Sequence, residues 1–458
     1  MRKLKEKLFY FLTGSIVSAS AIFLYLTFFA SEQEFSLRPV ELVRKNSELL
    51  ELERNLIKRQ SQIAAERQEF LSFRLAAMRG FGFNTPEDIS EVDRLRLEQN
   101  YIREALLNSA LQSRKRIEEL EARLENSASE LSLIRVNFAT NRRQKLPVSH
   151  SGAIEFGGER GDLAWGEAII SVPHERDIGE LNSPGWLVAK IWGADPTKHI
   201  VSQSTRLMSR DEIVALMKSN SSGINSSTLL FVHGYNTSFE DALRRTAQIT
   251  HDIEFSGNSL VFSWPSAAKK RAYPVDKANA EWSVTHLTSV LTTLLENEVS
   301  NDVVVIAHSM GSYVLTQALS RIATLRPDFR ERIRTIILAA PDIDAEVFKR
   351  DIAPKITTED QPITVYASSK DNALKASREF NGYPRLGDIA EVGRPILGVD
   401  LIDASKVETG FWGHTYFGDN ASVIADIYYL IRGKMNPSER FLERVETQQG
   451  SWWAFKTK

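Results

Sequence analysis

The chain contains no cysteine among its 458 residues. This absence excludes disulfides, thiol nucleophiles and thiolate metal sites, although it fits either a reducing or an oxidising compartment. The sequence also lacks a His-Glu-x-x-His pair of the kind that binds catalytic zinc on a helix, so nothing in it supports a metal hydrolase. We therefore expect neither a metal nor a cofactor.

An excess of one charge is missing too. The 57 basic side chains nearly balance the 59 acidic ones, for a formal net charge of −2. Without a basic surplus, binding to the phosphate backbone of a nucleic acid is disfavoured. A hydrophobic content of 42% is typical of globular proteins, and the length suffices for about three ordinary domains.

Charged residues are absent from the stretch Leu8 to Ala30, which is long enough for a bilayer-spanning helix of about 20 residues. The hydrophobic part of a cleaved signal peptide is usually shorter, which favours a membrane anchor. By the positive-inside rule, the flanking charges predict a cytoplasmic N-terminus and a remainder outside. The flanking residues are Arg2, Lys3, Lys5 and Lys7 before the stretch, and Glu32 and Glu34 after it.

Residues 31–140 have the apolar spacing of a coiled coil. The stripe runs from Leu42 to Phe73, breaks near residues 80–85, and returns from Ile89 to Ile134. This pattern predicts a helical stalk that follows the membrane segment. A spacer, a homo-oligomer through the coiled coil and a hairpin between the two helices all remain open.

From residue 150 to 435, short apolar runs alternate with helical segments. Strands without polar alternation, separated by helices, predict a parallel sheet covered on both faces, which is an α/β fold. Residues 436–458 are left as a C-terminal tail. The expected strands are 168–172, 186–192, 200–207, 228–233, 259–264, 302–308, 333–339, 363–368 and 399–402; the expected helices are 211–218, 239–253, 276–296, 310–322 and 422–431.

Ser309 follows an apolar β-branched run in the segment Ala307-His308-Ser309-Met310-Gly311, and a helical pattern follows it. In a nucleophile elbow, a strand turns sharply into a helix around a strained serine, so the residues two before and two after it must be small. The spacing predicts that Ser309 is a catalytic nucleophile.

Two backbone amides are predicted to form an oxyanion hole. The strand that ends at Val232 leads into His233-Gly234-Tyr235, where a glycine lets the backbone bend so that the Tyr235 N–H points at an oxyanion. The Met310 N–H is the second predicted donor, since it begins a helix whose positive end favours developing negative charge.

A serine hydroxyl needs a base to take its proton, and a neutral histidine suits this role. His414 is the predicted base, and Asp371, which follows the strand 363–368, is predicted to orient it. Asp342 and Asp344, which follow the strand 333–339, are the alternatives for this acid. The predicted triad therefore runs in the order Ser309, Asp371, His414.

These blocks resemble the α/β-hydrolase superfamily and, more narrowly, a bacterial branch whose function is unknown. The resemblance covers about residues 153–432 and includes Ala340-Pro341-Asp342-Ile343-Asp344 and Gly413-His414-Thr415. It implies an α/β-hydrolase fold, a Ser-His-Asp triad and hydrolysis of an ester-like bond. Ala307 stands where glycine is usual in the elbow. For a bacterial protein, the charge pattern predicts a single-pass inner-membrane location with the hydrolase domain in the periplasm.

We therefore expect a membrane-anchored serine hydrolase that cleaves carboxylic esters, of small molecules or lipids, through an acyl-enzyme. The few residues between Ala340 and Pro362 leave little room for a lid, which favours short acyl groups. The alternative is a membrane-anchored scaffold that uses the hydrolase fold and the coiled coil only for binding. Peptidase or acyltransferase activity would use the same triad and stays open.

Overall fold

The computed structural model describes residues 131–145, 154–181, 195, 198–221, 227–358, 361–392, 395–407, 416–433, 435–448 and 450–456. The predicted anchor at 8–30 and the stalk as far as residue 130 lie outside this set, as does the strand expected at 186–192. Within the described residues, no helix combines the length and the apolar character that a membrane span requires.

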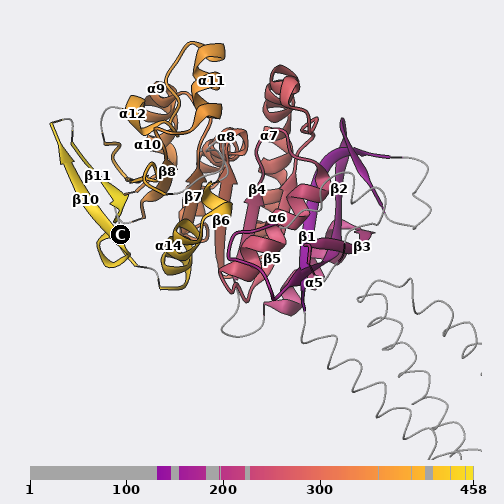
Figure 1. Ribbon diagram of the computed structural model, residues 1–458. Coiled ribbons are helices and arrows are strands. Elements are labelled where there is room, and N and C mark those ends of the chain that lie inside the picture. The colour runs from indigo at the N-terminus through magenta and orange to yellow at the C-terminus, as the bar shows by residue number, and fades with distance from the viewer. Residues whose placement is uncertain are drawn as a thin grey trace, which may run out of the picture. The chain divides into compact units, whose positions relative to one another are not determined.

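One sheet of eleven strands runs through the described part of the chain, in the order β10-β11-β9-β8-β7-β6-β4-β5-β1-β2-β3 (Figure 1). The neighbouring strands in the run β11-β9-β8-β7-β6-β4-β5-β1 pair in parallel. At the two ends of the sheet, β10 pairs antiparallel with β11, β2 with β1, and β3 with β2. Their bounds are β1 Leu131–Gln144, β2 Phe156–Pro173, β3 Val201–Met208, β4 Ser227–Val232, β5 Asn258–Ser263, β6 Asp302–His308, β7 Thr335–Ala339, β8 Ile363–Ala367, β9 Val399–Asp403, β10 Leu442–Thr447 and β11 Gly450–Phe455.

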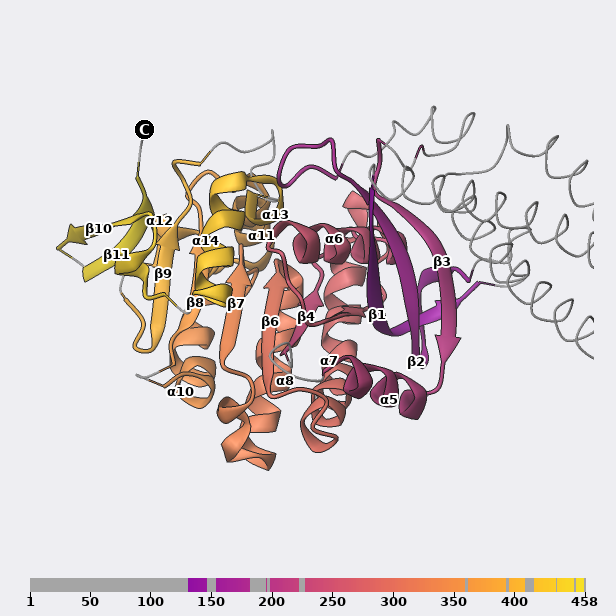
Figure 2. The ribbon, with the colours of Figure 1, turned by 90° about the horizontal axis from the view of Figure 1, so that it is seen from below.

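Helices cover both faces of this sheet (Figure 2). One face packs against α5, α7, α8 and α10, and the other packs against α6 and α14. The short helices α9, α11, α12 and α13 lie in the connections. The bounds are α5 Arg210–Asn220, α6 Phe239–Asp252, α7 Tyr273–Glu296, α8 Met310–Leu325, α9 Ala345–Val347, α10 Ala353–Ile356, α11 Asn372–Asn381, α12 Ile389–Val392, α13 Tyr416–Asp419 and α14 Ala421–Arg432.

The central strands are apolar on both sides because both sides are buried. In β6, Val303 and Val305 face the α7–α8 layer, whereas Val304 and Ile306 face the α6–α14 layer. Each fully buried valine or isoleucine side chain contributes roughly 1.5–3 kcal/mol through the removal of apolar surface from water. The predicted α/β fold with a mostly parallel sheet is thus confirmed, and the carboxyl ends of β4, β6, β7 and β8 meet at one edge.

Two predicted boundaries are wrong. Residues 131–140, assigned to the stalk, belong to strand β1, and the compact unit begins at Leu131. The spacing of Leu131 and Ile134 fits a helix, but β1 pairs with β2 on one side and β5 on the other, and these long-range contacts outweigh the local pattern. The tail at 436–458 contains the β10–β11 hairpin, whose second strand pairs with β9.

The stretch 372–398, which is not among the helices expected from the sequence, contains α11 and α12. Asp371 caps α11 at its N-terminus by accepting from the Leu374 N–H, and Gly382 ends the helix with a left-handed φ of 81°. The glycines and prolines of this stretch begin at Gly382, where α11 ends. These turn-forming residues obscure the helical pattern of α11 in the sequence.

Candidate active site

Ser309 occupies a sharp turn between β6 and α8. Its φ of 53° and ψ of −124° lie in a region that side-chain-bearing residues rarely adopt, so the turn is strained. Hydrogen bonds on both sides hold it: the Ser309 N–H donates to the Ala339 carbonyl at 2.9 Å, and the Asp342 N–H donates to the Ser309 carbonyl at 3.2 Å. The local geometry is that of a nucleophile elbow.

Close backbone approach explains the small residues around this turn. A Cβ added to Gly311 would lie 2.3 Å from the carbonyl oxygen of His233, so no larger residue fits where α8 crosses the end of β4. On the other side of the serine, Ala307 is fully buried and pairs with Val232 and Leu338 in the sheet. The strand accommodates this alanine in place of the usual glycine.

A cavity of about 730 Å³ opens above Ser309. The Gly234–Thr237 loop, His308 and Asp342 lie at its polar end. Its apolar lining comes mainly from β4, α7, α11 and α13: Phe231, Tyr273, Pro274, Ala373, Leu374, Ala376, Phe380 and Phe417, with Leu181 beside them. Polar side chains also line it, namely Asp241 and Arg245 of α6, Arg271 and Ser377.

An aromatic series forms one wall of this cavity. The Tyr273 ring meets Tyr235 edge to face at 5.7 Å and Phe380 edge to face at 5.3 Å. The Tyr273 hydroxyl donates to Asp342 at 2.8 Å, and burial together with this carboxylate raises the pKa of Tyr273 to about 12. The phenol therefore stays protonated at neutral pH, and its polar end is directed at Asp342.

Both predicted oxyanion donors lie beside Ser309. Tyr235 lines the cavity, and Met310 is the first residue of α8. Neither amide donates a backbone hydrogen bond to another described residue. Free amides at a helix start and at a strand end can stabilise an anion.

The three candidate acids have different surroundings. Asp342 accepts from three side chains, Tyr273, Ser377 at 2.6 Å and Arg385 at 2.7 Å. Asp344 caps α9 by accepting from two backbone amides. Asp371 is fully buried after β8, and its Oδ1 accepts from the Leu374 N–H at 3.0 Å. His414, the predicted base, lies outside the described residues.

The helix that begins two residues after His414 contributes to the cavity. Phe417 of α13 stacks on His308 with ring centroids 4.4 Å apart, and His308 adjoins Ser309. Arg245 of α6 holds the end of α13 by an ion pair with Asp419 at 2.6 Å. Its guanidinium also lies 5.9 Å from the centre of the Phe417 ring, within reach of a cation–π contact.

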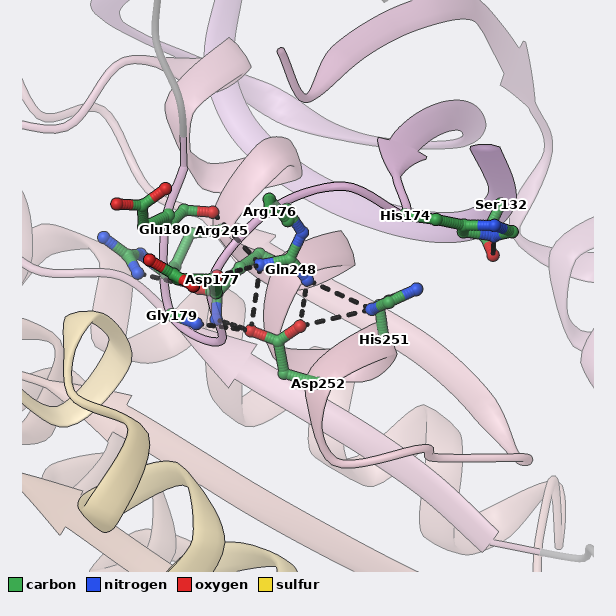
Figure 3. A network of polar contacts seen from close by, with 10 residues as sticks. All are labelled: Ser132, His174, Arg176, Asp177, Gly179, Glu180, Arg245, Gln248, His251 and Asp252. Carbon is green, nitrogen blue, oxygen red and sulfur yellow. Dashed lines mark hydrogen bonds and ion pairs between the residues drawn. The ribbon is translucent and has the colours of Figure 1, made fainter. Parts of the chain in front are cut away.

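Arg245 continues into a buried polar network that the sequence analysis missed (Figure 3). Its Nη1 donates to Gln248 at 2.7 Å, and Gln248 donates to Asp252 at 2.7 Å. Asp252 also accepts from Arg176 and, at 2.8 Å, from the Gly179 N–H. Burial would raise the pKa of Asp252, but hydrogen bonds from His251, Arg176 and Gln248 outweigh it and lower the pKa to about 2. The network fastens the loop 174–181 to α6.

The strained serine turn, the sheet order and the adjacent free amides define the class of α/β hydrolases. Within it, residues 209–433 match a family described as alpha/beta hydrolase of unknown function. This match agrees with the resemblance seen in the sequence, although it starts later than the expected residue 153.

Other comparisons give more distant relatives. An uncharacterized protein of Nostoc sp. is 25% identical over 32% of this chain and 53% of its own length, so the chain spans about half of that relative. A predicted CIB-like hydrolase from Thermoplasma acidophilum is 15% identical over 51% of this chain and 93% of that chain, with a TM-score of 0.26. A Trichoderma reesei cutinase in complex with a phosphonate inhibitor is 16% identical over 48% of this chain and 88% of the cutinase chain, also with a TM-score of 0.26.

Proposed function

We propose that the protein is a membrane-anchored serine hydrolase that cleaves carboxylic esters through an acyl-enzyme. One observation carries the proposal: Ser309 stands on a strained turn, in the lining of a cavity with many apolar side chains, beside two amides without backbone partners. A serine used only for structure has no need of this backbone conformation, which costs of the order of 1–3 kcal/mol.

In the proposed reaction, His414 takes the Ser309 hydroxyl proton as Oγ forms a bond to the ester carbonyl carbon. The carbonyl oxygen becomes an oxyanion and accepts from the Tyr235 and Met310 amides. The C–O bond to the alcohol then breaks, and His414 returns the proton to the leaving oxygen. Water repeats the sequence on the acyl-enzyme and releases the acid.

The position of Phe417 supports His414 as the base. His414 is three positions before Phe417, and an extended chain covers at most about 11 Å over three steps. Phe417 lies in the cavity wall against His308, which adjoins Ser309, and we infer from this spacing that His414 can act on the Ser309 hydroxyl.

Asp371 is the proposed acid. Asp342 already accepts from two hydroxyls and a guanidinium, and Asp344 caps a helix, so both have other uses. Asp371 is fully buried and directly follows β8, whose carboxyl end lies at the same edge of the sheet as the Ser309 turn. A buried carboxylate is what a catalytic histidine requires to hold its tautomer.

Short acyl chains are the proposed substrates, attached to small molecules or to lipids at the membrane. In the described part of the chain, the connections from β7 to β8 and from β8 to β9 contain only short helices, so no separate lid domain covers the cavity from there. The predicted helix at 8–30 would anchor the enzyme in the membrane. Extraction of the full-length chain by detergent, but not by high salt or carbonate, tests this anchoring.

Hydrolysis of p-nitrophenyl esters tests the activity. The full-length chain should cleave the butyrate ester faster than the dodecanoate ester. Ser309→Ala should abolish turnover, whereas Ser320→Ala on the same helix, whose hydroxyl bonds only within that helix, should retain it. Equal turnover by Ser309→Ala and the parent chain contradicts the proposed nucleophile.

His414→Ala and Asp371→Asn test the other two roles. Each should lower kcat by about 10³-fold or more, since both act with the serine as one unit. If Asp342→Asn reduces kcat strongly and Asp371→Asn does not, Asp342 is the acid and the proposed assignment is wrong.

A further inference from the structure

Arg142 of strand β1 is a buried arginine directly behind the Gly234–Thr237 loop. It is 2% exposed, and register irregularities on either side of it in β1 turn its side chain toward the loop. All five N–H donors of its guanidinium have acceptors. These are Ser263 Oγ at 2.8 Å, the carbonyls of Gly157 at 3.0 Å, Ser266 at 2.9 Å and Thr237 at 2.8 Å, and His233 Nε2 at 3.2 Å.

The contact with His233 determines the tautomer of that histidine. A guanidinium has no acceptor, so His233 Nε2 must accept from it, and the single proton of the neutral ring must be on Nδ1. Burial and the charge of Arg142 both lower the pKa of His233 well below its usual value, so the ring is neutral. Stacking on Trp264, with centroids 5.0 Å apart, fixes the plane of the ring.

His233 Nδ1–H donates to the carbonyl oxygen of Gly234 at 2.7 Å. This carbonyl and the Tyr235 N–H belong to one planar peptide group and point in opposite directions. A hydrogen bond that fixes the oxygen therefore also fixes the direction of the Tyr235 N–H. Donation to the oxygen further polarises the peptide group, which makes its N–H a stronger donor.

Asp276 of α7 holds the next peptide groups of the same loop. It accepts from the Asn236 N–H at 3.0 Å, from Ser266 Oγ at 2.5 Å and from the Ala267 N–H at 2.7 Å. Ser266 Oγ in turn accepts from the Thr237 N–H at 3.1 Å. The loop is thus attached at Gly234, Asn236 and Thr237, and the amide between these attachments is that of Tyr235.

We propose that Arg142 is a positioning residue of the oxyanion hole, acting through His233 on the Gly234–Tyr235 peptide. This inference deepens the proposed function and rests on it. Arg142 belongs to strand β1, which lies outside the segment 209–433 that matches the hydrolase family. Through the contact of Arg142 with His233, this strand would contribute to the geometry of the active site. Its effect falls on the transition state, because the oxyanion exists only there.

The test compares Arg142→Lys with Arg440→Lys in the full-length chain. Arg440 is an equally buried arginine that pairs with Asp426 at 3.1 Å and does not line the cavity. A lysine keeps the charge but cannot serve five acceptors in fork geometry. For Arg142→Lys, kcat on p-nitrophenyl butyrate should fall about 10-fold or more, with KM within two-fold. Arg440→Lys should lower Tm and leave kcat unchanged.

A trifluoromethyl ketone provides a readout that a purely structural role would not move, since its adduct with Ser309 carries an oxyanion. Its Ki should rise in Arg142→Lys by the same factor by which kcat/KM falls. Unchanged kcat and Ki in a folded Arg142→Lys, with an active parent chain, overturn the positioning role but not the esterase. An inactive parent chain overturns the esterase itself.

A pair of His233 variants gives a second test that does not require Arg142→Lys to fold. The asparagine in His233→Asn can place its amide N–H near the former Nδ1, whereas the longer glutamine in His233→Gln reaches toward the Nε2 side. His233→Asn should retain at least several-fold more kcat than His233→Gln. Equal kcat for the two variants overturns the proposed path through Gly234.

Discussion

Gly234 and Ser309 are in direct contact across the two loops that form the candidate site. A Cβ built on Gly234 would lie 2.9 Å from the Cβ of Ser309 and 2.9 Å from Nδ1 of His308. Real Cβ atoms do not approach this closely, so only glycine lets the loop after β4 reach the elbow after β6. The distance between the serine and the Tyr235 amide thus depends on a residue without a side chain.

Gly234→Ala should therefore abolish most of the activity without unfolding the protein. The added methyl group must displace either the elbow or the Tyr235 amide, and loss of one oxyanion donor typically costs about 10²–10³-fold in kcat. Steady-state turnover of p-nitrophenyl butyrate together with Tm checks this. A variant with parental kcat would mean that the loop does not contribute to the chemistry.

Phe380→Ala should raise KM while kcat stays nearly constant. The Phe380 ring lines the cavity and is 59% exposed, so a bound acyl chain would cover it. Loss of roughly 1–1.5 kcal/mol of apolar contact corresponds to about a 5- to 10-fold increase in KM. The matched control is Leu325→Ala, at the C-terminal end of α8, where the side chain is 70% exposed and does not line the cavity. This variant should change neither kcat nor KM. A fall in kcat alone would place Phe380 in the chemical step instead.

The pH profile should assign the catalytic base. His233 is held neutral because burial and the charge of Arg142 lower its pKa well below the usual value, so it does not account for a titration at the ordinary histidine pKa. A fall in kcat/KM on acidification near the ordinary histidine pKa of about 6.5 would then come from another histidine, which we propose is His414. The pH dependence of ester turnover measures this, and a flat profile from pH 5 to 8 would exclude a histidine base.

Asp252 should stabilise the fold at neutral pH and cease to do so in acid. Its pKa is lowered to about 2 in the folded state, below the ordinary aspartate value of 3.8, so the native state favours the carboxylate. The resulting stability is present above pH 3.8 and is lost as the pH falls through about 2; it amounts to about 2 kcal/mol. Asp252→Asn should therefore unfold more easily than the parent chain at pH 7, by urea titration, with a smaller difference at pH 3.

The matched control for this change is Asp328→Asn. Asp328 forms an exposed pair with Arg326 at 2.9 Å, where solvent screens the interaction. This variant should match the parent chain at both pH values. Equal stability of Asp252→Asn and the parent chain at pH 7 would show that the network in Figure 3 does not hold the loop 174–181.

The sequence predicted the central part of the fold closely because buried parallel strands are short apolar runs bounded by helices. The strand expected at 302–308 is β6 itself, and the helix expected at 310–322 is most of α8. The family match at residues 209–433 covers this central part of the fold. Ser309 was recognisable because the elbow requires small residues at fixed offsets, which is a local constraint.

Long-range determinants were not predictable in this way. Leu131 and Ile134 fit a heptad as well as a strand, and only pairing with β2 and β5 decides between them. Arg142 resembled a polar helix end, since nothing local indicates that five distant acceptors bury it. The β10–β11 hairpin had a local signal in Trp452 and Trp453, but its partner β9 lies about fifty residues earlier in the sequence.

The most direct test of the account is reaction of the full-length chain with a fluorophosphonate, followed by peptide mass spectrometry. We expect one phosphonylated residue, Ser309, and no adduct in Ser309→Ala. An adduct on a different serine, or an unmodified chain under conditions in which a known serine esterase reacts fully, would contradict it.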